Sequence, residues 1–145
     1  MHPEKMTGLE LLQAAIDGKF PRPPMSDTMP MEITEAKAGY ILGTARADER
    51  HINVMGGIHG GFAATILDSA TGCAVHSMLE AGVGYGTTDL SVKMFRPVPK
   101  GETLIVEGKI INLSRSLGVS EGTLKTADGK LLAHATATCF ILRRD

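Results

Sequence analysis

Two glycine pairs bracket a histidine in the stretch Asn53–Phe62, directly before an apolar run that is typical of a helix. The order is Gly56-Gly57, Ile58, His59 and Gly60-Gly61. Glycine lets the backbone approach a ligand closely and adopt positive φ. The first turn of a helix has unpaired N–H groups and a partial positive charge. A glycine-rich loop at a helix start therefore favours binding of an oxyanion or a polarised carbonyl.

A single acidic residue, Asp68, lies in the middle of the apolar run that follows this loop. The run consists largely of small residues, including Ala63, Ala64, Ala70 and Gly72. A helix that is apolar nearly all round is a buried one, and a buried carboxylate is costly unless it is paired. The carboxylate of Asp68 therefore needs a reason, and one explanation is that it acts as a general base or a nucleophile. The alternative is a structural carboxylate whose oxygens are satisfied by nearby backbone or serine groups.

The spacing between Gly60 and Asp68 constrains how the two residues can act together. They are eight residues apart, which corresponds to about 12 Å of rise along one helix. A carbonyl polarised by the Gly60 N–H must lie roughly 3 Å from the group that attacks it. If both residues act, Asp68 must serve a carbonyl that is held by Gly60 of a neighbouring subunit. Two central helices packed antiparallel across a twofold axis would allow this, so we expect at least a dimer.

The chain resembles the hotdog-fold acyl-CoA thioesterases, because Asn53, His59-Gly60-Gly61 and Asp68 stand at their spacing. The similarity is greatest to the PaaI-like (phenylacetate-degradation) branch of the 4-hydroxybenzoyl-CoA thioesterase superfamily. It continues through Thr87–Val92 and Phe95-Arg96-Pro97, and covers roughly residues 29 to 142. The resemblance implies hydrolysis of an acyl-CoA to the free acid and coenzyme A. The implied acyl group is aryl, arylacetyl or medium-chain, and coenzyme A enters only as part of the substrate.

The resemblance also implies roles for the residues of the loop and helix. Asp68 is the base or the nucleophile, and the Gly60 N–H polarises the thioester carbonyl. Asn53 holds the carbonyl or the lytic water, His59 braces the loop, and Thr87 orients the water. The alternative for His59 is a purely structural role, and for Thr87 an ordinary strand threonine.

For the coenzyme A moiety, the resemblance suggests a site along one edge of the sheet. The implied contacts are Arg96, Arg115, Ser116 and Gly118, and exposed charges beside turns are the alternative explanation for the two arginines. The resemblance further implies a homodimer with two equivalent sites across the interface, and a homotetramer as the complete assembly. No metal site is expected, since the remaining histidines lack the spacing of metal ligands, namely His2, His51, His76 and His134.

Length and charge exclude several other classes of protein. The 145 residues carry a net charge of -1, with 15 Lys and Arg against 16 Asp and Glu, and the basic residues do not cluster. Binding to nucleic acid or to a membrane surface is therefore not expected. Cys73 and Cys139 lie in apolar runs and indicate buried free thiols in a reducing compartment. With no long apolar stretch near the N-terminus, a cytoplasmic location is expected.

The pattern of elements predicts an α+β hotdog fold, in which about six antiparallel strands wrap around a long central helix. Residues 1–28 are expected to form an accessory helix and a proline-rich connector, and residues 29–145 the hotdog domain. The expected helices are Met6–Asp17, with Gly18 as its C-terminal cap, and His59–Glu80. The connector Lys19–Pro30 is expected to be extended. The expected strands are Met31–Lys37, Tyr40–Ala47, one around Leu90–Met94, Glu102–Leu113, Leu117–Thr126 and Leu131–Leu142.

Two rival functions share this fold. A hotdog enoyl-CoA hydratase or dehydratase would pair an aspartate with a histidine in a local motif that the sequence lacks. A non-catalytic acyl-CoA-binding or regulatory module would not require Asp68 in an apolar helix. The string Gly118-Val119-Ser120-Glu121-Gly122 matches the serine-hydrolase G-x-S-x-G motif, but it lies in an alternating strand rather than in a strand–turn–helix elbow.

Overall fold

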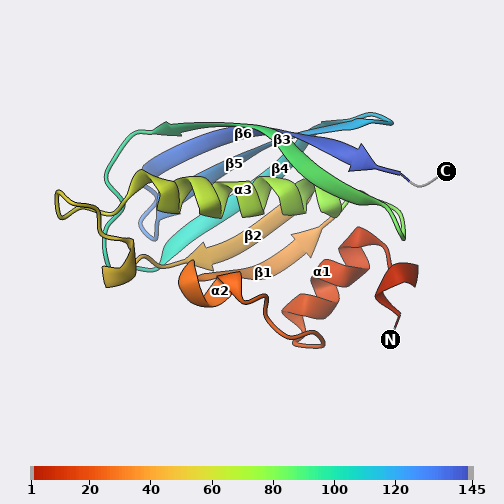
Figure 1. Ribbon diagram of the computed structural model, residues 1–145, viewed down its shortest axis with the longest axis horizontal. Coiled ribbons are helices and arrows are strands. Elements are labelled where there is room, and N and C mark those ends of the chain that lie inside the picture. The colour runs from red at the N-terminus through yellow and green to blue at the C-terminus, as the bar shows by residue number, and fades with distance from the viewer. Residues whose placement is uncertain (1, 144–145) are drawn as a thin grey trace.

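The computed structural model describes residues 2–143, and its six strands form one antiparallel sheet in the order β1-β2-β4-β5-β6-β3 (Figure 1). The helices are α1 (Gly8–Ile16), α2 (Met25–Thr28) and α3 (Gly60–His76), with short 3-10 turns at Pro3–Lys5 and Glu49–His51. The strands are β1 (Met31–Lys37), β2 (Tyr40–Ala45), β3 (Gly84–Met94), β4 (Leu104–Leu113), β5 (Leu117–Thr126) and β6 (Leu131–Leu142).

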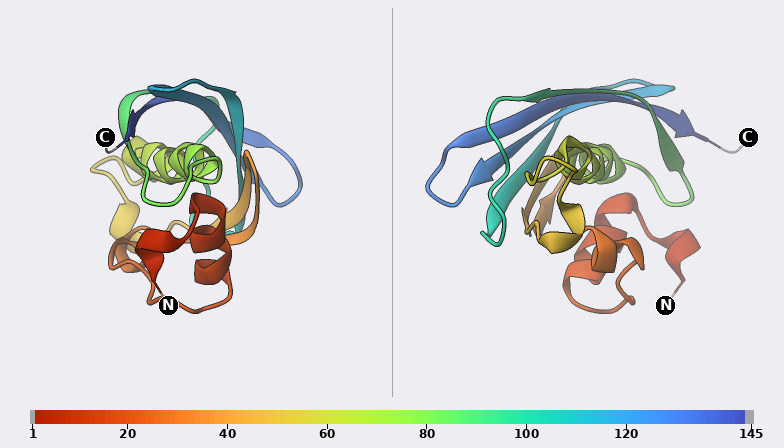
Figure 2. Two further views of the ribbon diagram at one scale, coloured as in Figure 1. Left: turned by 90° about the vertical axis from the view of Figure 1, so that its right-hand side faces the viewer. Right: turned by 60° about the vertical axis from the view of Figure 1, so that its left-hand side comes forward.

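The sheet curves around α3, and α1 and α2 lie on the side of α3 that the sheet leaves open (Figure 2). Strand β3 forms one edge of the sheet and pairs only with β6, while β1 forms the other edge. The expected hotdog arrangement, with six antiparallel strands, a central helix and a short N-terminal helix, is confirmed.

Small residues let the sheet approach α3 closely. On β6, the inward-facing residues Ala133, Ala135, Ala137 and Cys139 are all buried, as their alternation in the sequence predicts. Gly108 on β4 lies against the backbone of α3, where an added Cβ would stand 2.3 Å from the Ala70 carbonyl oxygen. The Ser120 hydroxyl of β5 donates to the Thr71 carbonyl of α3 over 2.9 Å, so a polar contact also joins the two layers.

The central helix is shorter than expected, because it ends at His76 rather than at Glu80. The Ser77 hydroxyl donates to the Ala74 carbonyl and accepts the Gly39 N–H, which ties the helix end to the β1–β2 turn. The next amides, of Met78 and Leu79, donate to carbonyls three residues earlier, so the chain continues in tight turns. None of the helices in residues 2–143 has the length and apolar character needed to cross a membrane.

The other bounds differ from expectation at strand and helix ends. The second strand ends at Ala45, and Ala47 instead makes an isolated bridge to Lys100. β4 begins two residues later than expected, at Leu104, and α1 begins at Gly8 because Thr7 forms a capping box with Glu10. Gly18 has a φ of 76° just after α1, as a C-terminal glycine should. The expected extended connector is wrong in one respect, since it contains the short helix α2.

The contact between Gly108 and α3 yields a stability prediction. Replacing Gly108 with alanine forces a methyl group into the Ala70 carbonyl, and such overpacking lowers the free energy of unfolding by about 1–3 kcal/mol or more. Gly86 on β3 is the matched control, because an added Cβ there meets nothing within 4 Å. Urea unfolding of both variants should show a lowered midpoint for Gly108→Ala alone. Equal midpoints would contradict the close packing of β4 on α3.

Candidate functional site

The loop before α3 is closed by the side chain of Asn53. Its Oδ1 accepts the N–H groups of Met55 at 2.9 Å and Gly57 at 3.2 Å, and its own N–H donates to the Gly57 carbonyl at 2.7 Å. Gly56 sits at the tip with a φ of 90°, which a residue with a side chain rarely adopts. The Asn53 oxygen is thus occupied within the loop, and the amide group Nδ2 is the part of this side chain that remains for a ligand.

His59 is the N-cap of α3 and fixes the loop to the helix. Its Nδ1 accepts the Gly61 N–H at 2.8 Å, and its carbonyl accepts the Phe62 N–H at 3.0 Å. The His59 N–H donates to the His51 carbonyl over 2.7 Å. These contacts satisfy two of the free amides of the first helical turn. Within residues 2–143 the Gly60 N–H has no such acceptor, so it is available at the positive end of the helix dipole.

A cavity of about 310 Å³ adjoins Gly60. It is lined by residues from α3, from the end of β3 and from β6, including Ala63, Met94, Arg96 and Ala133. Met94 lies so close to the Gly60 backbone that an added Cβ would stand 2.8 Å from its sulfur. Arg96 lines the cavity, and its guanidinium donates to the Leu131 carbonyl at 2.7 Å. The cavity therefore brings together Gly60 and Arg96, for which the family resemblance implies contacts with the carbonyl and with coenzyme A.

Asp68 lies two turns further along α3, and its Oδ1 is buried with no hydrogen-bond partner among the described residues. No neighbouring group among the described residues donates a hydrogen bond to this oxygen. Burial raises the pKa of the Cys73 thiol to about 11, and the Asp68 charge adds to that shift. Burial also raises the pKa of the Tyr85 hydroxyl, again with a contribution from Asp68. Both groups are therefore neutral near pH 7, and Cys73 lacks the thiolate character of a nucleophile.

Thr87 is exposed on the edge strand β3, opposite Cys139 of β6. Its hydroxyl lies 3.8 Å from the Cys139 sulfur, whose pKa is raised by burial and by the charge of Asp68. A bulge in the β3–β6 pairing follows directly, between Thr87 and Asp89. The Thr87 hydroxyl is thus in contact with the buried Cys139 of the neighbouring strand.

The remaining coenzyme A candidates lie at the other end of the molecule. Arg115 and Ser116 are exposed in the turn between β4 and β5. Gly118 is buried, and an added Cβ would stand 2.6 Å from a methyl group of Val75, near the C-terminal end of α3. Gly60 and Val75 are separated by about 22 Å of helix rise. One subunit therefore does not bring Arg115, Ser116 and Gly118 together with Arg96 and Gly60.

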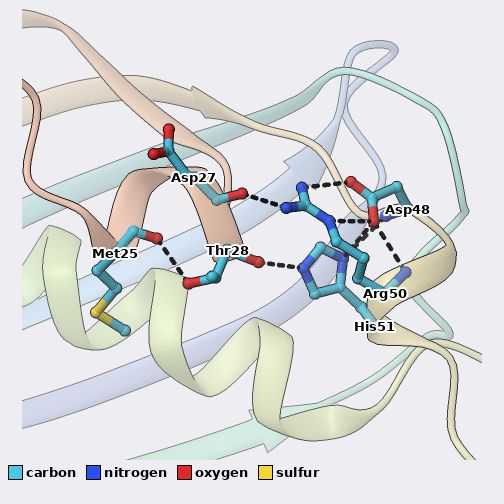
Figure 3. Close-up of polar contacts among 6 residues, drawn as sticks. All are labelled: Met25, Asp27, Thr28, Asp48, Arg50 and His51. Carbon is cyan, nitrogen blue, oxygen red and sulfur yellow. Dashed lines mark hydrogen bonds and ion pairs between the residues drawn. The ribbon is translucent and has the colours of Figure 1, made fainter.

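Sequence reasoning did not identify His51 as part of the site. This histidine is 7% exposed, and its ring stacks at a tilt on Phe62 of α3 with centroids 4.8 Å apart. Its Nδ1 accepts the Asp48 N–H at 2.9 Å, and its Nε2 lies 2.6 Å from the Thr28 carbonyl, so the proton is on Nε2 (Figure 3). In the sequence, the one sign that His51 supports the loop is its position two residues before Asn53.

Comparisons with known proteins show the family to which the chain belongs. Residues 55–133 match the model of the thioesterase superfamily. Acyl-coenzyme A thioesterase 13 of Homo sapiens is 25% identical over 107 residues, which are 73% of this chain and 76% of the human protein. The crystal structure of a phenylacetic acid degradation-related protein from Ralstonia eutropha JMP134 superposes with a TM-score of 0.81 at 29% identity, covering 89% of this chain and 98% of that one.

A second solved structure shares the fold. It is a hypothetical thioesterase protein from Streptococcus pneumoniae TIGR4 with coenzyme A, at a TM-score of 0.71 and 23% identity. The match covers 79% of this chain and 91% of that chain.

Proposed function

The chain belongs to the thioesterase superfamily and is an enzyme of thioester hydrolysis, and we propose that it converts acyl-CoA and water to the free acid and coenzyme A. The observation that carries the proposal is that, among residues 2–143, the buried Oδ1 of Asp68 has no hydrogen-bond partner and the first amide of the same helix, at Gly60, has no acceptor. A buried carboxylate oxygen with no hydrogen-bond partner among the described residues is poorly explained as part of a stabilising group. An oxygen that makes no internal hydrogen bond is suited to act as a base or a nucleophile.

The proposed chemistry uses one carboxylate and one amide dipole. The Gly60 N–H donates to the thioester oxygen and stabilises the negative charge that develops when the carbonyl is attacked. Asp68 either removes a proton from the attacking water or attacks the carbonyl itself to form a mixed anhydride, which water then opens. In both routes the thiolate of coenzyme A leaves and takes up a proton. The Asn53 Nδ2 and the Thr87 hydroxyl would hold the carbonyl and the water, and His59 keeps the loop in place.

The two central groups must come from different subunits in this proposal. Gly60 and Asp68 are fixed about 12 Å apart on one rigid helix, which exceeds the roughly 3 Å that the chemistry allows. Antiparallel packing of two α3 helices would place Asp68 of one subunit opposite the partner's Gly60. The same pairing would bring the Val75 end of α3, with Arg115 and Ser116 beside it, towards the partner's loop at Asn53. The coenzyme A contacts that lie apart in one subunit would then converge.

Surface features support a homodimer, with a homotetramer as the proposed full assembly. β3 is an edge strand whose outer side has no partner among residues 2–143, and such edges invite pairing. Exposed apolar residues lie at the loop and at the end of this strand, namely Val54, Met55, Met94 and Phe95. The likeness to the phenylacetate-related protein of Ralstonia eutropha supports the PaaI-like branch. Aryl, arylacetyl or medium-chain acyl groups, and a cytoplasmic location suited to the free thiols, complete the proposal.

The role of Asp68 leads to the first activity prediction. Thiol release from a panel of acyl-CoA esters should fall at least about 10²-fold in Asp68→Asn, because the base or nucleophile is lost. Glu102→Gln, which removes an exposed carboxylate, serves as the control and should keep full activity. A wild type that binds these esters without releasing thiol would favour the acyl-CoA-binding module instead.

Two substitutions at Gly60 distinguish the effect of losing its N–H group from the steric effect of adding a side chain. Gly60 is the first residue of α3, where proline is well tolerated, and His59 already has the φ of -60° and ψ of 136° that suit a residue before proline. Gly60→Pro removes the N–H, whereas Gly60→Ala keeps it and meets the same Met94 side chain. We expect kcat to fall about 10²–10³-fold in the proline variant relative to the alanine variant. Equal activities of the two variants, both with wild-type circular dichroism, would exclude the Gly60 amide as the carbonyl donor.

A further inference from the structure

The loop of residues 53–58, which leads into α3, is tied to the rest of the subunit at its base rather than at its tip. The tip is formed by Val54 and Met55, which are almost completely exposed. Within the part of the chain that the structure describes, the hydrogen bonds of this loop join its own residues to one another. At the base, the His59 N–H donates to the His51 carbonyl over 2.7 Å. The position of the loop therefore depends on how His51 is held.

The His51 side chain is buried and is held on three sides. Its Nε2–H donates to the Thr28 carbonyl of α2 at 2.6 Å, and its Nδ1 accepts the Asp48 N–H at 2.9 Å (Figure 3). The third contact is with Phe62 of α3, whose ring is buried in the core and lies 4.8 Å from the His51 ring, centre to centre. Both ring nitrogens are thus engaged within the subunit, and the ring joins α2 to the start of α3.

A second link joins α2 to the turn that contains His51. The Arg50 guanidinium donates to the Asp27 carbonyl and forms an ion pair of 2.8 Å with Asp48 (Figure 3). The bonds from Arg50 hold the pKa of the Asp48 carboxyl well below its usual range, so the pair stays charged at neutral pH. The Arg50 side chain is 53% exposed, however, and exposed ion pairs contribute little to stability. The buried contacts of His51 are therefore the stronger link between α2 and the base of the loop.

His51 also holds both sides of the Gly60 amide. The His59 carbonyl and the Gly60 N–H belong to one planar peptide group, so fixing one fixes the direction of the other. The His59 carbonyl accepts the Phe62 N–H at 3.0 Å, and the Phe62 ring packs against the His51 ring. On the other side, the His59 N–H is bound to the His51 carbonyl. The direction of the Gly60 N–H therefore follows the position of His51.

We propose that His51 is a positioning residue, which holds the Gly60 amide where the thioester oxygen binds and makes that contact depend on the docking of α2. The proposal rests on the proposed thioesterase function, in which the Gly60 N–H polarises the carbonyl. His51 acts through His59 and Phe62 rather than as a donor to the substrate, because both of its ring nitrogens are engaged. A displacement of about 1 Å at a reacting centre can lower the rate by about 10²-fold. Since the amide stabilises charge that develops in the transition state, a misplaced amide lowers kcat more than it raises KM.

The test removes the hydrogen bonds of the His51 side chain and keeps an aromatic ring in its place. His51→Phe retains a ring against Phe62, but it neither bonds the Thr28 carbonyl nor accepts the Asp48 N–H. His51→Gln is the conservative variant, because its amide nitrogen is a donor that reaches about as far as the Nε2 of histidine. For decanoyl-CoA we expect kcat to fall at least about tenfold in His51→Phe, with KM within about twofold, and His51→Gln to recover most of the wild-type value. His134→Phe, which alters a partly exposed histidine of β6, should match the wild type.

Two changes at Gly60 show whether His51 acts through the amide. In Gly60→Pro the N–H is absent, so adding His51→Phe should lower kcat by less than about twofold. In Gly60→Ala the N–H remains, and the same addition should again lower kcat at least about tenfold. Equal losses in both backgrounds would mean that His51 supports only the fold, and would overturn the positioning role.

Binding measurements separate this proposal from the proposed function. Calorimetry gives the Kd of two analogues that are not hydrolysed. One is the ketone in which a methylene replaces the thioester sulfur of decanoyl-CoA, and the other is S-decyl-CoA, which lacks the carbonyl. The wild type should bind the ketone more tightly than the thioether, and His51→Phe should lose that preference while His51→Gln keeps it.

Each result has a distinct meaning. The expected Kd values without thiol release from the wild type would overturn the catalytic proposal alone. A folded His51→Phe with unchanged kcat and unchanged preference for the ketone would overturn the positioning role. A wild type without that preference would overturn the carbonyl contact of Gly60, and with it both proposals. If circular dichroism shows that His51→Phe does not fold, His51→Asn takes its place, because it keeps an acceptor for the Asp48 N–H and loses only the donor to Thr28.

Discussion

The close contact between α3 and the curved sheet governs the rest of the molecule. Gly108 leaves no room for even a methyl group against the Ala70 carbonyl, and the small residues of β6 keep the sheet equally near. A helix held at this distance by backbone contacts cannot shift or bend without losing packing. Every group on α3 therefore has a fixed place, from the free amide at Gly60 to the buried carboxylate at Asp68. The precision of the candidate site follows from that packing.

The same rigidity prevents the two groups from acting on one substrate within a single subunit. A flexible loop could close a gap of about 12 Å, but two positions on one straight helix cannot. Within residues 2–143 the outer edge of β3 has no pairing strand, and Val54, Met55, Met94 and Phe95 are exposed, so one subunit leaves these surfaces uncovered. A second copy of the chain would supply what each of these surfaces lacks.

The sequence predicted the regular elements well where local chemistry defines their ends. β5 and β6 have the expected bounds, because alternating residues meet at the Asp128-Gly129 hairpin and Gly129 has a φ of 94°. The start of α3 at Gly60 could also be predicted, because the glycine pairs around His59 directly precede the apolar run. The four residues of α2 are too few for a periodic pattern, and the bonds of His51 join residues 23 positions apart in the chain. The position of α2 against His51 therefore could not be predicted from the sequence alone.

A mixed-subunit experiment tests most directly whether the site is shared. Gly60→Pro and Asp68→Asn are produced with different affinity tags, dissociated and reassociated, and the heterodimer is purified through both tags. In a shared site, one of its two centres has an intact Gly60 from one subunit and an intact Asp68 from the other. We predict that the heterodimer regains about half of the wild-type thiol release, although each parent is nearly inactive. A purified heterodimer as inactive as its parents would show that Gly60 and Asp68 do not act across a subunit interface.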